Sequence, residues 1–431
     1  MELADTEFEI DEDYDEYDNE DTFYDDGDGL VPPPIEEEPE KGGHGCLVAG
    51  IITALALIAV IVLFMTVDDG FIGTYKQNFS NNFTRLFGNW VGGVRTEEAP
   101  KAASANNKQI KSSTLISLDN PDNAVFAVYK QGILCASSNH MSYTDKQGNL
   151  IWETDTAIVE PILSAEGNYI LIAEKGRRKL CLYSDKNLVY DTDDPDNIVA
   201  AKVSTRGDVV AVTDKSSYRG GISVYNKDGQ QVYSWASGHD TVISADISAS
   251  SRRVAVALLN TDSNAKSIIQ FFDLNVESSY SQAEIINTVV YGLQFTGNTL
   301  TAFGDNRLCV FSDSGDLVAN NELSDVQITH SAIDDKGNTL LSIDSGNTPV
   351  LNLYSPKGAL KETMGLGGVV SFIDIDGKNV LYSIGRDIYF GRINAKKIAK
   401  YTATMDIRRL LLLSDNTFVV VYSNSLEVIT V

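Results

Sequence analysis

Cysteine and histidine, the residues that most often build metal and redox centres, are scarce in this sequence of 431 residues. There are four of each, and no two cysteines are adjacent or separated by two residues. Structural zinc sites and redox dithiols depend on such spacings, so both classes are excluded. The serine-nucleophile elbow, the phosphate-binding glycine loop and the His-Glu-x-x-His motif are absent too. The sequence therefore predicts no catalytic residue, no metal site and no bound cofactor.

Basic residues are missing from the first 40 positions, which contain 19 Asp and Glu. The other 391 residues carry a net charge of only −7 (34 basic against 41 acidic), so the acidity belongs to an N-terminal tail. A segment with so much charge and so little apolar surface cannot offset its ordering entropy, and we expect residues 1–41 to be disordered. The tail is either solvated without a fixed partner or, through its alternating Asp and Tyr, a short motif for a basic protein. Nucleic acid is not expected as a partner, because the chain has no basic patch.

Long apolar runs are also rare, and one reaches the thickness of a bilayer. Residues 46–67 are 22 consecutive residues without a charge, which as a helix span about 30 Å. The run is too long, and starts too far from the N-terminus, for a cleaved signal peptide. It predicts a single transmembrane helix, with the lipid bilayer as a partner. The flanking basic residues, Lys41 before it and Lys76 and Arg85 after it, slightly favour a cytoplasmic C-terminus.

Two further segments follow this apolar run. Residues 71–91 carry aromatic side chains three and four positions apart, such as Tyr75, Phe79 and Phe83. This spacing predicts an amphipathic helix that lies at the membrane interface or packs against a partner or the following domain. Residues 92–110 are small and polar, which is typical of a flexible linker.

Helical periodicity is absent from residues 111–431, where a strand pattern repeats instead. In each unit an apolar strand ends in an aromatic residue, and a tight turn with Asp, Asn or Gly follows. The intervals between these aromatic residues are 40, 42, 47, 39, 43 and 36 residues, the length of a four-stranded propeller blade. The aromatic landmarks are Tyr143, Tyr183, Tyr225, Phe272, Phe311, Tyr354 and Phe390. The pattern predicts an all-β fold, an eight-bladed β-propeller over residues 111–431, with seven blades as the alternative.

The last unit supplies only three strands, at 406–413, 417–423 and 425–431. Residues 111–118 are a spare strand ahead of the first unit. We expect this strand to complete the last blade, because that closes the ring and removes an exposed edge.

Short polar clusters within the repeat resemble metal sites at first sight. The stretch RLCVFSDSGDLV, Arg307 to Val318, combines a thiol with alternating oxygens, yet the Cys and the Asp are present in some of its near-copies elsewhere and absent from others. We expect it to be the third strand, turn and fourth strand of one blade, with Cys309 in the core. Two pairs of carboxylates, Asp334 with Asp335 and Asp374 with Asp376, are expected at hairpin turns between first and second strands.

The propeller resembles two known families. Gly238 and His239, ahead of a strand, are similar to the Gly-His start of a WD repeat. The turn around Tyr143, Gly148 and Trp152 is more similar to quinoprotein-like eight-bladed propellers. The calcium-ligand set, the adjacent cysteines and the repeated tryptophan signature of the enzymatic quinoproteins are not kept, which argues against quinone-dependent oxidation.

The order of acidic tail, single membrane helix and degenerate propeller resembles an uncharacterised family of single-pass proteins from Gram-positive-type bacteria. That resemblance implies a cell-membrane protein with a cytoplasmic tail and an extracytoplasmic propeller, the opposite of the charge asymmetry. It favours a non-enzymatic binding or scaffolding role at the cell surface, with a protein or envelope component as partner. The alternative is an extracytoplasmic enzyme with an active site on the top of the propeller. The longest departures from the repeat contain Tyr218 and Arg219 in one loop and Asn260 and Asp262 in another, and these are the candidate partner-binding residues.

Overall fold

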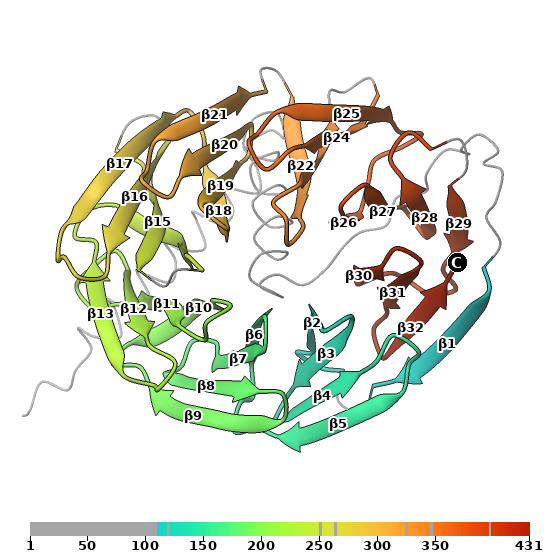
Figure 1. Ribbon diagram of the computed structural model, residues 1–431, viewed down its shortest axis with the longest axis horizontal. Coiled ribbons are helices and arrows are strands. Elements are labelled where there is room, and N and C mark those ends of the chain that lie inside the picture. The colour runs from blue at the N-terminus through green and yellow to red at the C-terminus, as the bar shows by residue number, and fades with distance from the viewer. Residues whose placement is uncertain are drawn as a thin grey trace, which may run out of the picture. The chain divides into compact units, whose positions relative to one another are not determined.

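The structure is a computed structural model that describes residues 110–118, 121–249, 252–262, 265–323, 326–344, 348–395 and 398–431. The regular structure of these residues is entirely β. Its 32 strands form eight four-stranded antiparallel sheets, which are arranged as the blades of a ring in Figure 1. The predicted all-β, eight-bladed propeller is therefore confirmed, and the seven-bladed alternative is wrong.

We number the blades by the order of their first strands along the chain. Blades 1 to 4 contain β2 (Val125–Tyr129), β3 (Gly132–Ser137), β4 (His140–Thr144), β5 (Leu150–Asp155); β6 (Pro161–Glu166), β7 (Tyr169–Glu174), β8 (Lys179–Ser184), β9 (Asn187–Asp193); β10 (Asn197–Val203), β11 (Val209–Asp214), β12 (Gly221–Tyr225), β13 (Gln231–Ala236); β14 (Thr241–Ile247), β15 (Arg253–Asn260), β16 (Lys266–Asp273) and β17 (Ser279–Ile286). Blades 5 to 8 contain β18 (Val290–Thr296), β19 (Thr299–Gly304), β20 (Arg307–Ser312), β21 (Leu317–Glu322); β22 (Gln327–Ile333), β23 (Thr339–Asp344), β24 (Val350–Tyr354), β25 (Leu360–Gly365); β26 (Phe372–Asp376), β27 (Asn379–Ile384), β28 (Asp387–Arg392), β29 (Ala399–Thr402); and β30 (Arg409–Ser414), β31 (Thr417–Val421), β32 (Ser425–Thr430) with β1 (Ser112–Ser117).

The predicted closure of the ring is confirmed by the pairing of β1 in blade 8. Strand β1 pairs antiparallel with β32, from Ser112 opposite Thr430 to Ser117 opposite Ser425. Figure 1 shows the two strands side by side, β1 in teal and β32 in dark red, although they come from opposite ends of the described chain. The last blade thus takes its outer strand from ahead of the first blade.

The core lies between neighbouring blades. The second and third strands of a blade are almost continuously buried, as in β11 and β12. The fourth, outer strands alternate exposed and partly buried residues, as in β21. Each of eight apolar clusters joins two adjacent sheets around the ring, including one between blades 8 and 1. Continuous apolar runs suit strands that are covered on both faces.

The stretch from Arg307 to Val318 has the predicted role. Strand β20 ends at Ser312, a turn follows, and β21 begins at Leu317. Gly315 has a φ of 86°, and a Cβ there would lie 2.5 Å from Ser281 Oγ on the neighbouring blade, so both conformation and space require glycine. The Cys309 side chain is buried, with 3% of its surface exposed.

Several predictions fall on residues outside this description. These are the disordered tail (1–41), the transmembrane helix (46–67), the amphipathic helix (71–91) and all but the last residue of the linker (92–110). Among the residues described, none lies in a helix long and apolar enough to cross a membrane.

Candidate functional site

The chain topology gives the propeller two different faces. In an antiparallel blade the turns from first to second and from third to fourth strand leave at one end, and the other connections leave at the opposite end. We call the face with the first-to-second turns the lower face, and the face with the second-to-third and blade-to-blade connections the upper face. Every first strand therefore runs from the upper to the lower face.

The four candidate partner-binding residues lie together on the upper face of blades 3 and 4. Tyr218 and Arg219 are in the β11–β12 connection, and Asn260 and Asp262 are at the β15–β16 connection. The backbone of Arg219 joins the first loop to the connection between the blades, because its amide donates to Ser237 O (2.7 Å) and its carbonyl accepts from Val242 N (3.0 Å).

His239 joins the connection between the blades to the β15–β16 loop through its ring nitrogens. Nδ1 is 2.9 Å from Asp240 Oδ1, and Nε2 is 3.2 Å from Asp262 Oδ2. Asn260 Nδ2 donates to the same Asp240 oxygen at 2.7 Å. The hydrogen bond to Asp240 and the charge of Asp262 raise the pKa of His239, which favours its cationic form.

These five residues, Tyr218, Arg219, His239, Asn260 and Asp262, form what we call the loop patch. The Tyr218 side chain is 51% exposed, and Arg219 and His239 are exposed beside it. The sequence brought out the two loops by their length. It gave no sign that His239 contacts Asp262, because this contact depends on how the loops of blade 4 pack against the connection from blade 3.

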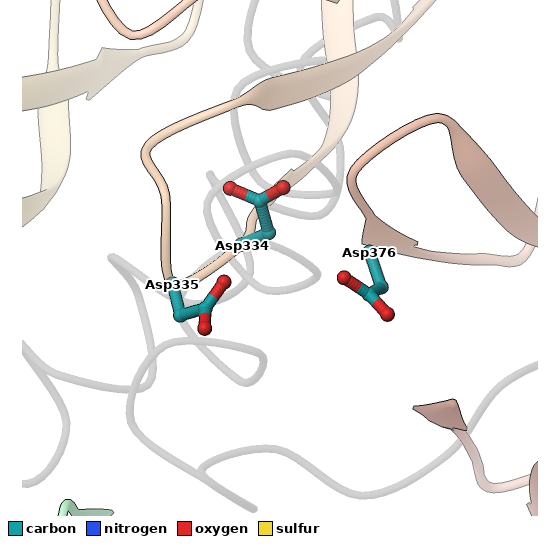
Figure 2. A group of neighbouring side chains, drawn as sticks. All are labelled: Asp334, Asp335 and Asp376. Carbon is teal, nitrogen blue, oxygen red and sulfur yellow. The ribbon is translucent and has the colours of Figure 1, made fainter. Parts of the chain in front are cut away.

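A carboxylate cluster lies on the lower face. Ligand oxygens of Asp334, Asp335 and Asp376 lie within 4.8 Å of one another, and Figure 2 shows the three side chains converging from two neighbouring hairpins. Both oxygens of Asp334 are already used. Oδ1 accepts from Lys336 N (3.0 Å) and Asn338 N (2.8 Å), and Oδ2 accepts from Asn338 Nδ2 and from Gly377 N of the next blade (both 2.8 Å). Asp334 thus fixes its own turn and links blades 6 and 7, as its predicted turn position suggests.

Asp374 differs from its expected place. It lies inside β26 rather than in the turn, and its Oδ2 accepts from Leu412 N of blade 8 at 2.8 Å. Ser164 and Asp246 make the same kind of contact, with Val203 N (3.3 Å) and Phe295 N (2.6 Å) of the blade that follows each. The inner edge of a first strand has no neighbouring strand, so its amides need such side-chain acceptors. The prediction that Asp374 lies in a hairpin turn was therefore wrong, because this residue lies in the first strand that precedes the turn.

A cavity of about 200 Å³ lies at the inner strands, on the side of blades 1 to 3. Its apolar wall comes from β2, β6 and β10. Besides Ser164, five longer polar side chains also line it, from five different blades: Glu166, Lys202, Asp246, Gln294 and Arg409. We refer to this space as the central cavity.

Two of the cavity's charges form a pair within the protein. Lys202 Nζ donates to Leu293 O (2.6 Å) and Gln294 Oε1 (3.1 Å), and lies 3.6 Å from Asp246 Oδ2. Burial raises the pKa of Asp246, while Lys202 and the amides of Phe295 and Ile247 oppose the shift. Such a network fixes the side chains and crosses blades 3, 4 and 5.

Glu166 and Arg409 line the same cavity with different surroundings. Burial and the neighbouring Asp246 raise the pKa of Glu166 to about 7, with Asp335 adding to the shift and Lys202 opposing it. Burial lowers the pKa of Arg409 and the Asp374 carboxylate opposes this, yet a guanidinium keeps its proton in proteins. The cavity therefore contains a cation and a carboxyl group that changes its charge near neutral pH.

Sequence reasoning did not find the cavity residues, although a signal existed. Each lies in a first strand, as in LSAEG, AAKVS and SADIS, where a charged residue interrupts an apolar run. Aligning the units on their first turn would have placed all of these residues in the first strands. Aligning the units on the aromatic residue of the third strand did not reveal this.

The cysteines are consistent with the expected core role. Cys181 and Cys309 are buried, Cys135 is partly buried, and all three thiols are free. Burial raises the pKa of Cys135 to about 12 and that of Cys181 and Cys309 to about 11. Thiols that stay protonated at neutral pH are poor nucleophiles.

Comparison with solved structures supports the fold. The chain is similar to BamB from Moraxella catarrhalis (13% identity, TM-score 0.52, covering 75% of this chain and 99% of that one). It is also similar to the computationally designed protein Ika8 (15%, 0.57, 74% and 100%) and to the C-terminal WD40 domain of Sif2 (12%, 0.55, 76% and 99%). At such identities the similarity shows the propeller fold alone. No curated protein sequence matches the chain. A family model does match, over residues 103–431, and its description is a family of unknown function, DUF5711.

Proposed function

The chain belongs to the family DUF5711, and from that premise we propose that its propeller is a non-enzymatic binding or scaffolding module, anchored to the cell membrane. Its partner is a protein or a component of the cell envelope. The observation that carries the proposal is the loop patch, to which two adjacent blades each contribute a loop on the same face. Both loops are held by the same blade-to-blade connection.

The chemistry of the loop patch suits partner docking. Tyrosine and arginine are enriched at protein interfaces, and here both are exposed in one loop. The Arg219 side chain forms no hydrogen bond or ion pair within the part of the chain that the structure describes. The neighbouring charges largely neutralise one another, since His239 lies between Asp240 and Asp262. An exposed aromatic ring and an available guanidinium, on loops with fixed backbones, provide an anchor of the kind found at binding hot spots.

The same geometry argues against catalysis at this patch. A histidine acting as general base uses one ring nitrogen for its orienting carboxylate and the other for the nucleophile. In His239 both nitrogens face carboxylates, at 2.9 and 3.2 Å. Neither nitrogen is then placed to take a proton from a hydroxyl or thiol group.

The predicted helix at 46–67 would anchor the propeller to the membrane, and the chain that carries it enters the propeller at β1. The residues before Ser112 join the propeller at β1, which is an outer strand. We propose that the tail is cytoplasmic and the propeller extracytoplasmic, as the resemblance implies. Protease added to intact protoplasts should then remove residues 92–431 and leave the tail. Digestion of the tail with protection of the propeller would reverse the topology.

Photocrosslinking in intact cells tests the docking surface. A photoreactive residue replaces Tyr218 in the full chain, and the matched control carries it at Lys227, which is exposed on the lower face of the same blade. We expect one discrete adduct from position 218 that disappears in the Arg219→Ala background. Equal adducts from both positions would contradict the proposal. Reproducible substrate turnover by the purified chain would favour the enzyme alternative instead.

A further inference from the structure

The charged groups of the central cavity divide into two sets, according to whether the protein satisfies them. Lys202 and Asp246 belong to the first set, because both form hydrogen bonds to blade 5. The Glu166 carboxyl and the Arg409 guanidinium belong to the second, since no described residue forms a hydrogen bond or ion pair with either group. Both side chains are half-buried, so a ligand bound in the cavity would replace water as their hydrogen-bond partner. Both groups therefore have bonding capacity that a bound molecule can use.

The two unsatisfied groups lie toward opposite ends of the cavity. Glu166 is the last residue of β6, and Arg409 is the first residue of β30. Because all first strands run in the same direction, Glu166 lies toward the lower face and Arg409 toward the upper face. The lining also includes apolar side chains such as Phe126, Ile162 and Leu163.

These features define the chemistry of a matching ligand. A guanidinium pairs best with a carboxylate, through two parallel hydrogen bonds. A carboxylate in the position of Glu166 accepts hydrogen bonds from an ammonium group. The volume of about 200 Å³ suits a small ligand. Lys202 does not compete for the ligand's carboxylate, because Asp246 already neutralises it.

We propose that the central cavity binds a small zwitterion, with the ligand's carboxylate on Arg409 and its ammonium on Glu166. A short apolar linker between the two charges lies against the wall. The site is separate from the loop patch. A failure of ligand binding in the cavity would therefore leave the proposal of partner docking on the upper face untouched.

Calorimetric titration of the purified full chain tests this site. The probes are glycine, β-alanine, 4-aminobutanoate and 6-aminohexanoate, which separate the two charges by increasing lengths, together with acetate and methylammonium as single-charge controls. We expect at least one zwitterion to bind saturably, at least tenfold more tightly than either control. Acetate binding as tightly as the best zwitterion would overturn the proposal, and so would no binding by any probe at 10 mM.

Substitutions then locate the site. Glu166→Gln keeps the shape of the side chain and should weaken the best zwitterion at least tenfold, while acetate is unaffected. Arg409→Lys keeps the charge but loses the planar fork, and should weaken both the zwitterion and acetate. Glu277→Gln, at an exposed outer position, is the matched control and should bind as the wild type does. Unchanged binding by the Glu166 variant would overturn the assignment.

The pH profile gives a readout that a structural role would not change. The wild type should bind the zwitterion more tightly at pH 8 than at pH 6, because Glu166 must lose its proton to accept an ammonium. The groups that act on this carboxyl are Asp246, Asp335 and Lys202. The Glu166→Gln variant should lose the dependence over this range, and retention of the dependence in that variant would contradict the role of Glu166.

Discussion

Two glutamates in the ring show how differently one side chain can be used. Glu427 lies in β32, where only 7% of its surface is exposed. Its carboxylate accepts from Tyr401 Oη (2.8 Å), Tyr422 Oη (2.7 Å) and Ser113 Oγ. Glu166, in contrast, lines the central cavity and has no hydrogen bond to a described residue. The fold supplies hydrogen-bond donors to the Glu427 carboxylate, whereas the Glu166 carboxyl group is available to a bound molecule.

The surroundings of Glu427 explain why such a group is buried in the blade that closes the ring. Ser113 comes from β1, Tyr401 from blade 7 and Tyr422 from the end of β31. One carboxylate thus connects the N-terminal strand, the last strand and the preceding blade. We call these four residues the closure cluster. The comparison separates polar groups that build the ring from those available for binding, and the following predictions test that separation.

The largest effect is expected when the closure is removed. Deleting residues 111–118 removes the six paired residues of β1 and leaves Glu427 with one partner fewer. Each lost hydrogen bond costs about 1 kcal/mol, so the free energy of unfolding should fall by at least about 4 kcal/mol. Thermal unfolding should remain a single transition at a lower temperature. Deleting residues 1–40 is the control and should leave the melting temperature unchanged, and an equal melting temperature after the first deletion would refute the closure.

Glu427→Gln tests the carboxylate alone. An amide keeps the volume but replaces charged acceptor oxygens, and hydrogen bonds to charged groups are worth about 1.5–3 kcal/mol. We expect a loss of about 2 kcal/mol in urea unfolding. Glu277→Gln, which is exposed, should change stability by less than about 0.5 kcal/mol. Similar losses in the two variants would show that the closure cluster has no special role.

Tyr401→Phe removes one donor and should cost about 1 kcal/mol at pH 7. It also changes the response to alkali. Burial and the Glu427 carboxylate raise the pKa of Tyr401 to about 12, from an ordinary value of 10.0. The folded state holds this proton more tightly, so its contribution is complete below pH 10 and is lost as pH rises toward 12. The stability difference between wild type and variant should therefore shrink over that window, and a constant difference would contradict the linkage.

A gain in stability, rather than a loss, is expected at the other glutamate. Burial raises the pKa of Glu166 from 4.5 to about 7, so the folded state binds this proton more tightly than the unfolded state. Stability then falls as pH rises from about 4.5 through 7, because ionisation is less favourable in the cavity. Glu166→Gln cannot ionise and should be more stable than wild type at pH 8, by about 1 kcal/mol after allowance for solvent screening. Lower stability at pH 8 would mean that the fold itself uses the carboxylate.

The repeat was predictable because its signals are local. A landmark such as Phe311 and a turn glycine such as Gly315 report on a few neighbouring residues, and the closing strand followed from counting what was left over. Glu166 and Arg409 were not predictable in this way. They lie 243 positions apart in the sequence and share a cavity only because eight blades close into a ring. The contact between His239 and Asp262 was missed for the same reason, since it joins loops whose distance is set by blade packing.

The most direct test compares Glu166→Gln and Glu427→Gln side by side, at pH 7.5, for both melting temperature and affinity for the best-bound zwitterion. We predict opposite outcomes. Glu427→Gln should melt at a lower temperature than wild type and, while folded, bind the zwitterion normally. Glu166→Gln should melt at the wild-type temperature or above and bind at least tenfold more weakly. The same pattern in both variants, with stability and binding lost together, would contradict the separation of a carboxylate that closes the ring from one that binds a ligand.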